Sequence, residues 1–334
     1  MTRLLALDVG KTGCRAALSE DGHRVATGEW SGASGLADRD GVGRALAAVD
    51  GATGGWPAPD AVAAGLAGLA SAPDRAAALA DGLRERFGAG VRVLLASDMT
   101  TWHAGALGGA PGVVLAAGTG TVALGIDSAG RPARVDGWGY LLGDAGSGHA
   151  IGRGGLDAAL RAHDGRPGGS ATLLARLRDR WGDPDALPGR IHGSDNPARE
   201  VARFARDVVD AAGTGDPVAG AIVTRAASDL ADTAAAARDR LDPGPAGPHG
   251  PHGPHGPHGP HGPHGSDGPW PVACAGGLLD AGPVLTRPLD DALAARALTR
   301  TPPRGDALDG ARLLLEDPTV PHHALLAPLP GVLR

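Results

Sequence analysis

The sequence contains few aromatic residues, two cysteines and one lysine among its 334 residues. Two cysteines, Cys14 and Cys274, support no disulfide framework and cannot form a four-cysteine zinc site. Aromatic residues make up 3% of the chain, so leucine, valine and alanine are expected to fill the cores. No apolar run approaches the ~18 residues of a membrane span. With no hydrophobic leader before the strand expected from residue 3, the sequence favours a cytoplasmic protein.

Positive charge is carried almost entirely by arginine, because Lys11 is the only lysine. The formal net charge is −6, and no long basic run interrupts the sequence. Neither nucleic acid nor an anionic membrane is therefore indicated as a partner. The length fits two domains or one large domain.

Strand and helix patterns alternate along the chain, which indicates an α/β fold. A strand–glycine turn–strand module occurs near residues 4–18 and again near 113–126. This repetition favours an internally duplicated α/β unit with its two glycine hairpins facing each other across a cleft. The expected strands are 3–8, 13–19, 23–30, 61–70, 91–98, a hairpin over 112–127, and 271–279; the expected helices are 41–50, 74–87, 100–109, 196–241 with a break near Gly213, and 305–316.

Six copies of Pro-His-Gly fill residues 248–265. Proline and glycine preclude a packed core there, so the tract is predicted to be a disordered insertion over 243–269. Histidine tracts also bind divalent metals, which is the alternative interpretation.

The two glycine hairpins suit phosphate binding, because backbone N–H groups of a glycine-lined turn can approach phosphate oxygens closely. Asp8 ends the first strand and is suited to hold Mg²⁺ through water. Either hairpin alone is better explained as a tight structural turn, whereas the pair favours a nucleotide cleft. The candidate phosphate-binding residues are Gly10, Lys11, Thr12, Gly13, Gly118, Thr119, Gly120 and Thr121.

Asp98 follows the apolar run 91–97 at the edge of the expected cleft. A carboxylate in this place can accept the proton of a hydroxyl group that attacks a γ-phosphate. The alternative is that Asp98 caps the helix that follows.

The glycine-rich stretch 136–156 is predicted to be a ligand loop. Trp138 can form a wall for a sugar ring, and Asp144 can accept hydrogen bonds from sugar hydroxyls. The same stretch could instead cap a helix that starts near Ser147. Later in the chain, Gly276 and Gly277 end a strand and would let a flat nucleoside lie against the backbone; a helix-start turn is the alternative.

In their order, these motifs resemble the N-acetylglucosamine kinase branch of the BadF/BadG/BcrA/BcrD ATPases, which belong to the actin-like, ribonuclease-H-like sugar kinases. The resemblance rests on DxGxTGxR at residues 8–15, a strand ending in Asp98, GTGT at 118–121, DGWGYLLGDAGSGHAIGR at 136–153 and the double glycine at 276–277. The segment 136–153 is the most specific of these.

The resemblance implies a duplicated ribonuclease-H-like fold with two lobes around a central cleft. The expected lobes are 1–108 and 109–304, with 305–334 packing back on the first. ATP, Mg²⁺ and an amino sugar are the implied ligands, and such kinases are often homodimers. The implied roles are Asp98 as base for the sugar 6-hydroxyl, Asp8 for Mg²⁺, residues 10–13 and 118–121 for phosphates, Gly137, Trp138, Gly139 and Asp144 for the sugar, and Gly276 and Gly277 for adenosine.

Three departures from the family pattern lie on the sugar side. Ala145 replaces a usual glutamate, Ala67 replaces a serine, and the loop 29–41 lacks the common asparagine. N-acetylglucosamine is the first expectation, with glucosamine or another hexose derivative as alternatives. A non-catalytic sugar-binding protein and an iron–sulfur dehydratase activator are further alternatives; the apolar surroundings of both cysteines disfavour the activator.

Overall fold

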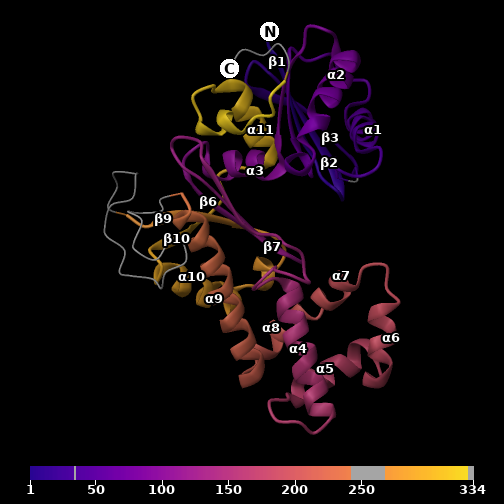
Figure 1. The fold of residues 1–334 in the computed structure, drawn as a ribbon, viewed down its shortest axis with the longest axis vertical. Helices are drawn as coiled ribbons and strands as arrows, with labels where there is room; N and C mark the ends of the chain where they lie inside the picture. Colours follow the sequence, from indigo (N-terminus) through magenta and orange to yellow (C-terminus); the bar gives the residue numbers. More distant parts are fainter. Residues whose placement is uncertain (34, 242–267, 330–334) are drawn as a thin grey trace. The chain divides into compact units, whose positions relative to one another are not determined.

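The computed structural model describes residues 1–33, 35–241 and 268–329. The chain divides into two compact units (Figure 1). Unit 1 comprises Met1–Pro111, Ile126–Pro132 and Pro302–Arg334, and unit 2 comprises Gly112–Gly125 and Ala133–Thr301. The Pro-His-Gly tract and the insertion predicted around it lie outside the described residues, except for 268 and 269.

A five-stranded mixed sheet forms the centre of unit 1, in the order β3-β2-β1-β4-β5. β1 pairs antiparallel with β2 and parallel with β4, and β4 pairs parallel with β5. The elements of this unit are β1 (Arg3–Val9), β2 (Gly13–Glu20), β3 (His23–Ser31), α1 (Gly41–Thr53), β4 (Ala61–Leu66), α2 (Ala76–Phe87), β5 (Arg92–Ser97), α3 (Asp98–Leu107) and α11 (Ala307–Glu316).

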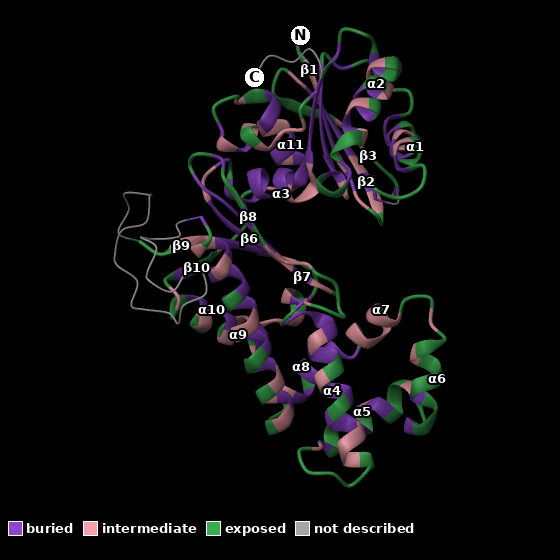
Figure 2. Cartoon of the chain, viewed as in Figure 1, coloured by how far each residue is buried: buried purple, intermediate pink, exposed green. Residues whose placement is uncertain are grey.

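Side-chain size differs between the two faces of this sheet. Leu5 and Leu7 of β1 join the core formed with α1 and α2, whereas Ala6 between them joins the core formed with α11. β4 and β5 alternate in the same way, as expected for strands buried on both faces. Figure 2 shows these strands as almost continuously buried. The alanine face therefore leaves room for α11 to lie close to the sheet.

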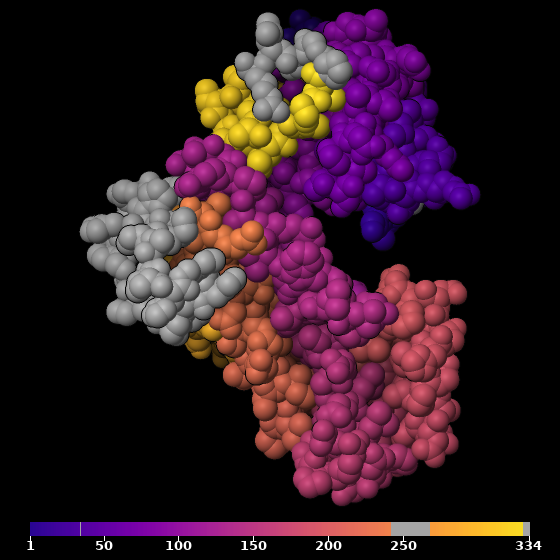
Figure 3. Space-filling view, viewed as in Figure 1, coloured from indigo at the N-terminus to yellow at the C-terminus, as the bar shows by residue number. Residues whose placement is uncertain are grey.

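Glycines let α11 and α3 approach each other at backbone distance. A Cβ on Gly105 would lie 1.8 Å from the carbonyl oxygen of Asp306, and one on Gly310 would lie 1.8 Å from that of Thr101. α11 begins with a capping box between Asp306 and Asp309. Figure 3 shows this C-terminal segment, in yellow, lying against the N-terminal part of unit 1.

The second sheet repeats the order of the first. Its order is β10-β9-β6-β7-β8, with β9 parallel to both β6 and β10. Read from β8, this is the same succession as β3-β2-β1-β4-β5, so the predicted duplicated α/β fold is confirmed. The elements are β6 (Gly112–Ala117), β7 (Thr121–Ile126), β8 (Pro132–Asp136), α4 (Gly148–His163), α5 (Ala171–Trp181), α6 (Leu187–His192), α7 (Pro197–Ala202), α8 (Ala205–Gly213), α9 (Pro217–Asp239), β9 (Trp270–Ala275), α10 (Pro283–Ala294) and β10 (Leu298–Thr301).

Most predicted elements occur with small shifts at their ends. The strand expected over 61–70 ends at Leu66, and the strand expected over 271–279 ends at Ala275, because Gly276 turns the chain with a φ of +114°. The helical stretch 196–241 breaks at the expected glycines and also between α7 and α8. The sequence did not predict β8, β10, α5, α6 or α10. Among the described residues, no helix is long and apolar enough to cross a bilayer.

Candidate functional site

The carboxyl ends of β1, β4 and β5 meet at one edge of the first sheet. Val9 pairs with Leu66, and Leu66 pairs with Ser97. Asp8 and the hairpin after it therefore share this edge with Asp98, two strands away, or about 10 Å at the usual strand spacing. Ligands of α/β folds commonly bind at such an edge.

The first glycine hairpin is held in one conformation by the segment after β3. Inside the turn, the N–H group of Gly10 donates to the carbonyl oxygen of Gly13 at 2.9 Å. The N–H group of Ala33 donates to the carbonyl of Gly10 at 3.1 Å, and Gly32 lies directly against the turn. Lys11 and Thr12 remain exposed at the tip, where they can reach a ligand.

Asp8 belongs to an ion-pair network that the sequence did not predict. Asp8 and Arg15 are cross-strand partners, and Nη2 of Arg15 donates to Oδ2 of Asp8 at 2.7 Å. Nη1 of Arg15 donates to Oδ2 of Asp306 at the start of α11, also at 2.7 Å. Burial would raise the pKa of Asp306, but the N–H group of Asp309 and the charge of Arg15 bring this pKa below its ordinary value.

Asp98 is the first residue of α3, and the strand before it ends one residue earlier than predicted. The alternative that Asp98 caps the helix is wrong: Ser97 is the N-cap, and its Oγ accepts the N–H group of Thr100 at 3.1 Å. Oδ1 of Asp98 accepts the N–H group of Met99 at 2.9 Å. The side chain is half-buried, so the fold orients this carboxylate without enclosing it.

The second glycine hairpin is fixed by the start of α4. The N–H group of Gly118 donates to the carbonyl oxygen of Gly120 at 2.9 Å. The carbonyls of Gly118 and Thr119 accept the N–H groups of Gly148 and His149, at 2.8 and 3.1 Å. Ser147 caps α4, as the sequence suggested, by accepting the N–H group of Ala150. The first N–H groups of α4 thus support the hairpin.

The predicted sugar loop is attached to the same hairpin. Asp136 accepts the N–H groups of Asp144 and Ala145 at 2.8 and 3.0 Å. Asp144 is buried with a φ of +60°, and a Cβ on Gly120 would lie 2.6 Å from its Oδ2. In contrast, Trp138 is 71% exposed. The loop therefore has a rigid base at Asp144 and an exposed aromatic tip.

The double glycine follows β9, whose last residue, Ala275, pairs with Ala116 near the end of β6, beside the second hairpin. A Cβ on Gly276 would lie 2.2 Å from the carbonyl oxygen of Ala117, which the N–H group of Leu278 also approaches, at 3.3 Å. Glycine is thus required at position 276, both because φ is positive and because a Cβ would collide with the carbonyl oxygen of Ala117. Gly277 is exposed, and a Cβ there would meet only Oδ2 of Asp280, at 3.8 Å.

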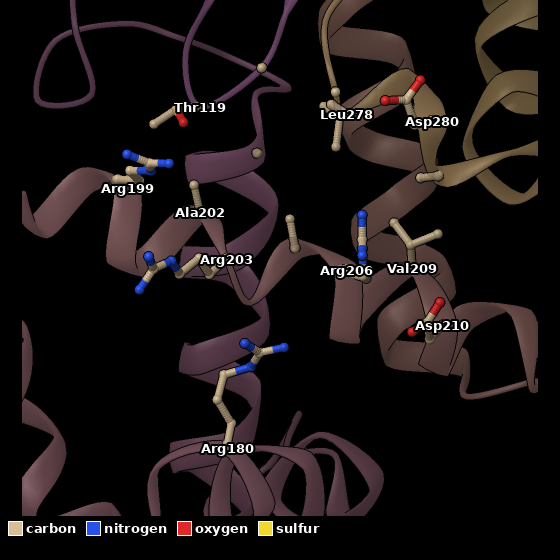
Figure 4. A pocket seen from close by; sticks show the side chains of 15 residues that line it. Thr119, Arg180, Arg199, Ala202, Arg203, Arg206, Val209, Asp210, Leu278 and Asp280 are labelled. Atoms are coloured by element: carbon tan, nitrogen blue, oxygen red, sulfur yellow. The ribbon is translucent and has the colours of Figure 1, made fainter. Parts of the chain in front are cut away.

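Unit 2 contains a cavity of about 720 Å³ (Figure 4). Its volume lies in the range typical of small-molecule sites. Gly118 and Thr119 of the hairpin line it together with Gly277, so the structure joins two motifs that lie about 160 residues apart in the chain. The other lining residues are Gly148, Arg180, Arg199, Ala202, Arg203, Ala205, Arg206, Val209, Asp210, Leu278, Asp280 and Ala281.

Sequence reasoning did not find the four arginines of this cavity. Arg199, Arg203 and Arg206 follow the i, i+4, i+7 spacing of one helix face, a signal that was available but not used. Arg203 pairs with Glu200 at 2.6 Å, and Arg180 pairs with Asp207 at 2.7 Å. Within the described ranges, the guanidinium groups of Arg199 and Arg206 have no acidic partner within 4.0 Å.

The remaining predicted residues lie elsewhere in their units. The cavity lining does not include Gly120, Thr121 or Gly276, although each lies within two residues of a lining residue in the sequence. It also does not include the loop residues from 137 to 144. Asp8, residues 10–13 and Asp98 belong to unit 1. That the two hairpins face each other stays a prediction.

Both cysteines are buried, and burial is the main cause of their raised thiol pKa values. The pKa of Cys14 rises to about 11, with a further contribution from Asp8, and that of Cys274 rises to about 12. Thiolates are the metal-binding form of cysteine, so neither residue is poised as a ligand. No group of three potential metal ligands occurs within 1–33, 35–241 and 268–329.

The family model of the BadF/BadG/BcrA/BcrD ATPases matches residues 5–246, and the chain belongs to this family. An N-acetylmuramic acid/N-acetylglucosamine kinase from Clostridium acetobutylicum is 32% identical over 142 residues, which are 42% of this chain and 46% of the relative. An N-acetyl-D-glucosamine kinase from Dictyostelium discoideum is 32% identical over 124 residues, 36% of this chain and 39% of the relative. The chain thus spans less than half the length of these curated relatives.

Solved structures match over nearly the whole chain. A candidate N-acetylglucosamine kinase from Chromobacterium violaceum is 30% identical with a TM-score of 0.64, over 95% of this chain and 99% of the other. A ROK family glucokinase from Streptomyces griseus, in complex with glucose and AMPPNP, has the same fold at 20% identity, with a TM-score of 0.51 over 93% and 98% of the two chains.

Proposed function

We propose that this protein is an ATP-dependent kinase that phosphorylates the 6-hydroxyl of an amino sugar, with N-acetylglucosamine as the first candidate. The observation that carries the proposal is the cavity of unit 2, which combines a glycine hairpin, a double glycine and arginines. The similarity to N-acetylglucosamine kinases from two organisms supports the choice of sugar.

The nucleotide is proposed to bind in this cavity. Backbone N–H groups of the hairpin around Gly118 and Thr119 would bind phosphate oxygens. Ala205, Val209 and Leu278 supply an apolar wall for the base, next to the exposed Gly277. This division into a polar and an apolar side is what a nucleotide requires.

Asp98 is proposed to accept the proton of the sugar 6-hydroxyl while the oxygen of that hydroxyl attacks the γ-phosphorus and ADP leaves. Asp8 suits a site for Mg²⁺ held through water, because Arg15 donates only to Oδ2, and none of the hydrogen bonds found in the described part of the chain uses Oδ1. Bound there, Mg²⁺ would neutralise charge on the phosphates. Lys11 and Thr12 are exposed donors at the same sheet edge.

The sugar is proposed to contact Trp138, the neighbouring glycines Gly137 and Gly139, and Asp144. The exposed indole offers an apolar face for the ring. The N-acetylmuramic acid/N-acetylglucosamine kinase among the relatives makes N-acetylmuramic acid a second candidate substrate. Ala67 and Ala145, which replace polar residues of the family pattern, leave room for a substituted sugar.

The iron–sulfur activator alternative is disfavoured by Cys14 and Cys274, because burial keeps both thiols protonated. A sugar-binding protein without turnover is the remaining alternative. It differs from the proposal in one measurable property, the release of ADP.

A coupled ADP-release assay with ATP, Mg²⁺ and a sugar panel tests the proposal. The panel contains N-acetylglucosamine, N-acetylmuramic acid, glucosamine, N-acetylmannosamine and glucose. We expect the highest kcat/KM for an N-acetylated sugar, with phosphate on O6 of the product by NMR. Sugar binding by calorimetry without ADP release would support the non-catalytic alternative and overturn the kinase.

A further inference from the structure

We propose that Arg199 and Arg206 are phosphate-binding residues that make the cavity of unit 2 selective for polyphosphate-bearing nucleotides over nucleosides. This inference rests on the proposed function and adds to it two residues that none of the family motifs contains. Both arginines belong to the segment from α7 to α8, which crosses the cavity opposite the hairpin and the double glycine (Figure 4).

The first argument is charge. Four arginines and two aspartates line the cavity. Arg180, Arg203 and Asp210 are each ion-paired with a residue outside the lining. The remaining charges of the lining, on Arg199, Arg206 and Asp280, sum to +1, in a chain whose formal net charge is −6. A positively charged cavity attracts anions. The cavity is thus suited to a polyanion.

The second argument is the state of each arginine. Arg180 and Arg203 are held by Asp207 and Glu200, so their charges are largely compensated. Arg199 and Arg206 have no such partner among the described residues, and each presents five N–H donors. Arginine forks match phosphate oxygens in geometry and charge, which lysine does less well.

The third argument is position. In Figure 4 the guanidinium group of Arg199 lies toward Thr119, and the side chain of Arg206 points toward Leu278. A ligand that extends from the apolar wall to the hairpin would pass both arginines. A nucleoside diphosphate has this form, with a flat apolar end and a doubly phosphorylated end. Inorganic pyrophosphate has the same anionic end without the base.

Isothermal titration of the full chain with ADP, adenosine and pyrophosphate tests the inference. Because a hydrogen bond to a charged group is strong, we expect Arg199→Gln and Arg206→Gln each to weaken ADP binding about tenfold. Pyrophosphate affinity should fall by a similar factor, and adenosine affinity should not change. Arg190→Gln is the matched control, because Arg190 is an exposed arginine of α6 outside the cavity.

Three results separate the inference from the proposed function. ADP binding that is equal in the wild type, both variants and the control would overturn the inference and leave the kinase intact. Weaker pyrophosphate binding in the variants, together with no ADP release by the wild type, would support the arginine site and overturn the kinase. An equal loss of adenosine and ADP affinity would overturn the inference, because it would mark a packing role. Far-ultraviolet circular dichroism and melting temperatures confirm that each variant is folded.

Discussion

At the residue scale, the charge and basicity of the Asp98 side chain can be removed without changing where the side chain lies. Asp98→Asn keeps the oxygen that accepts the N–H group of Met99, so the start of α3 should persist. The amide cannot accept a proton at neutral pH. We expect kcat to fall at least about 100-fold while ATP affinity and the melting temperature stay near those of the wild type. Unchanged kcat would remove Asp98 from the base role.

Alanine substitutions at the neighbouring Gly276 and Gly277 should have different effects on the free energy of unfolding. An alanine at 276 must keep a φ of +114° and place its Cβ 2.2 Å from the carbonyl oxygen of Ala117. Gly276→Ala should therefore lower the free energy of unfolding by roughly 3 kcal/mol. Gly277→Ala meets only the flexible Oδ2 of Asp280, at 3.8 Å, and should cost less than about 1 kcal/mol. Denaturant unfolding measures both values, and equal losses would contradict the argument.

At the residue scale, the sequence predicted those residues whose type alone indicates a local structure. The glycines of both hairpins and the cap at Ser147 are visible in the sequence because turns and caps need those residue types. Asp98 was misplaced by one residue, since Ser97 and Asp98 are both good N-caps. The arginines at 199 and 206 were not found, because arginine is the general cation of this chain and the two residues lie on separate helices, α7 and α8.

At the element scale, the α3–α11 crossing depends on glycine. A Cβ on Gly310 would lie 1.8 Å from the carbonyl oxygen of Thr101, so Gly310→Ala should separate the helices and cost roughly 3 kcal/mol of unfolding free energy. Gly220→Ala is the control within α9, where a Cβ meets nothing within 4 Å. That change should stabilise by about 0.5–1 kcal/mol, because alanine favours helix. A neutral Gly310→Ala, by urea unfolding, would refute the close approach.

β1, β4 and β5 were predicted because strands buried on both faces are continuous apolar runs. The bounds of β1 and β5 were predicted within one residue, whereas β4 ends four residues before the predicted end. β8 and β10 were not predicted: they have five and four residues and are largely exposed, so they carry no clear apolar period. The α5–α7 region was missed in part because its short helices are separated by glycine, proline and aspartate. α7, which carries Arg199, lies at the start of the helical stretch that was predicted over 196–241.

At the scale of the whole molecule, the buried His322 should make stability depend on pH in the acid range, in addition to His149, whose pKa burial also lowers. Burial, and then the nearby His103 and His323, lower the pKa of His322 from 6.5 to about 3. The folded protein keeps this ring neutral where the unfolded chain protonates it, so stability is complete above about pH 6.5 and declines as the pH falls toward 3. From pH 6.5 to 4.5 the contribution should fall by about 2 kcal/mol.

Urea unfolding at a series of pH values measures this slope. His322→Asn removes the hydrogen bond of 2.8 Å to His103 and will lower stability at every pH, but its slope between pH 6.5 and 4.5 should be shallower than that of the wild type. His23→Asn, at an exposed histidine of β3, should leave the slope unchanged. Parallel slopes for the wild type and His322→Asn would show that this ring does not govern acid stability.

The close packing of α11 on the alanine face of the first sheet has a consequence for biosynthesis. The strands of that sheet leave the ribosome first, but their covering helix is translated only after every residue of unit 2. Unit 2 can complete its own core while the earlier half of the nascent chain still presents bare alanines and leucines. Folding of unit 1 is therefore completed last, because α11 is the last helix to be translated and it covers the sheet that was translated first.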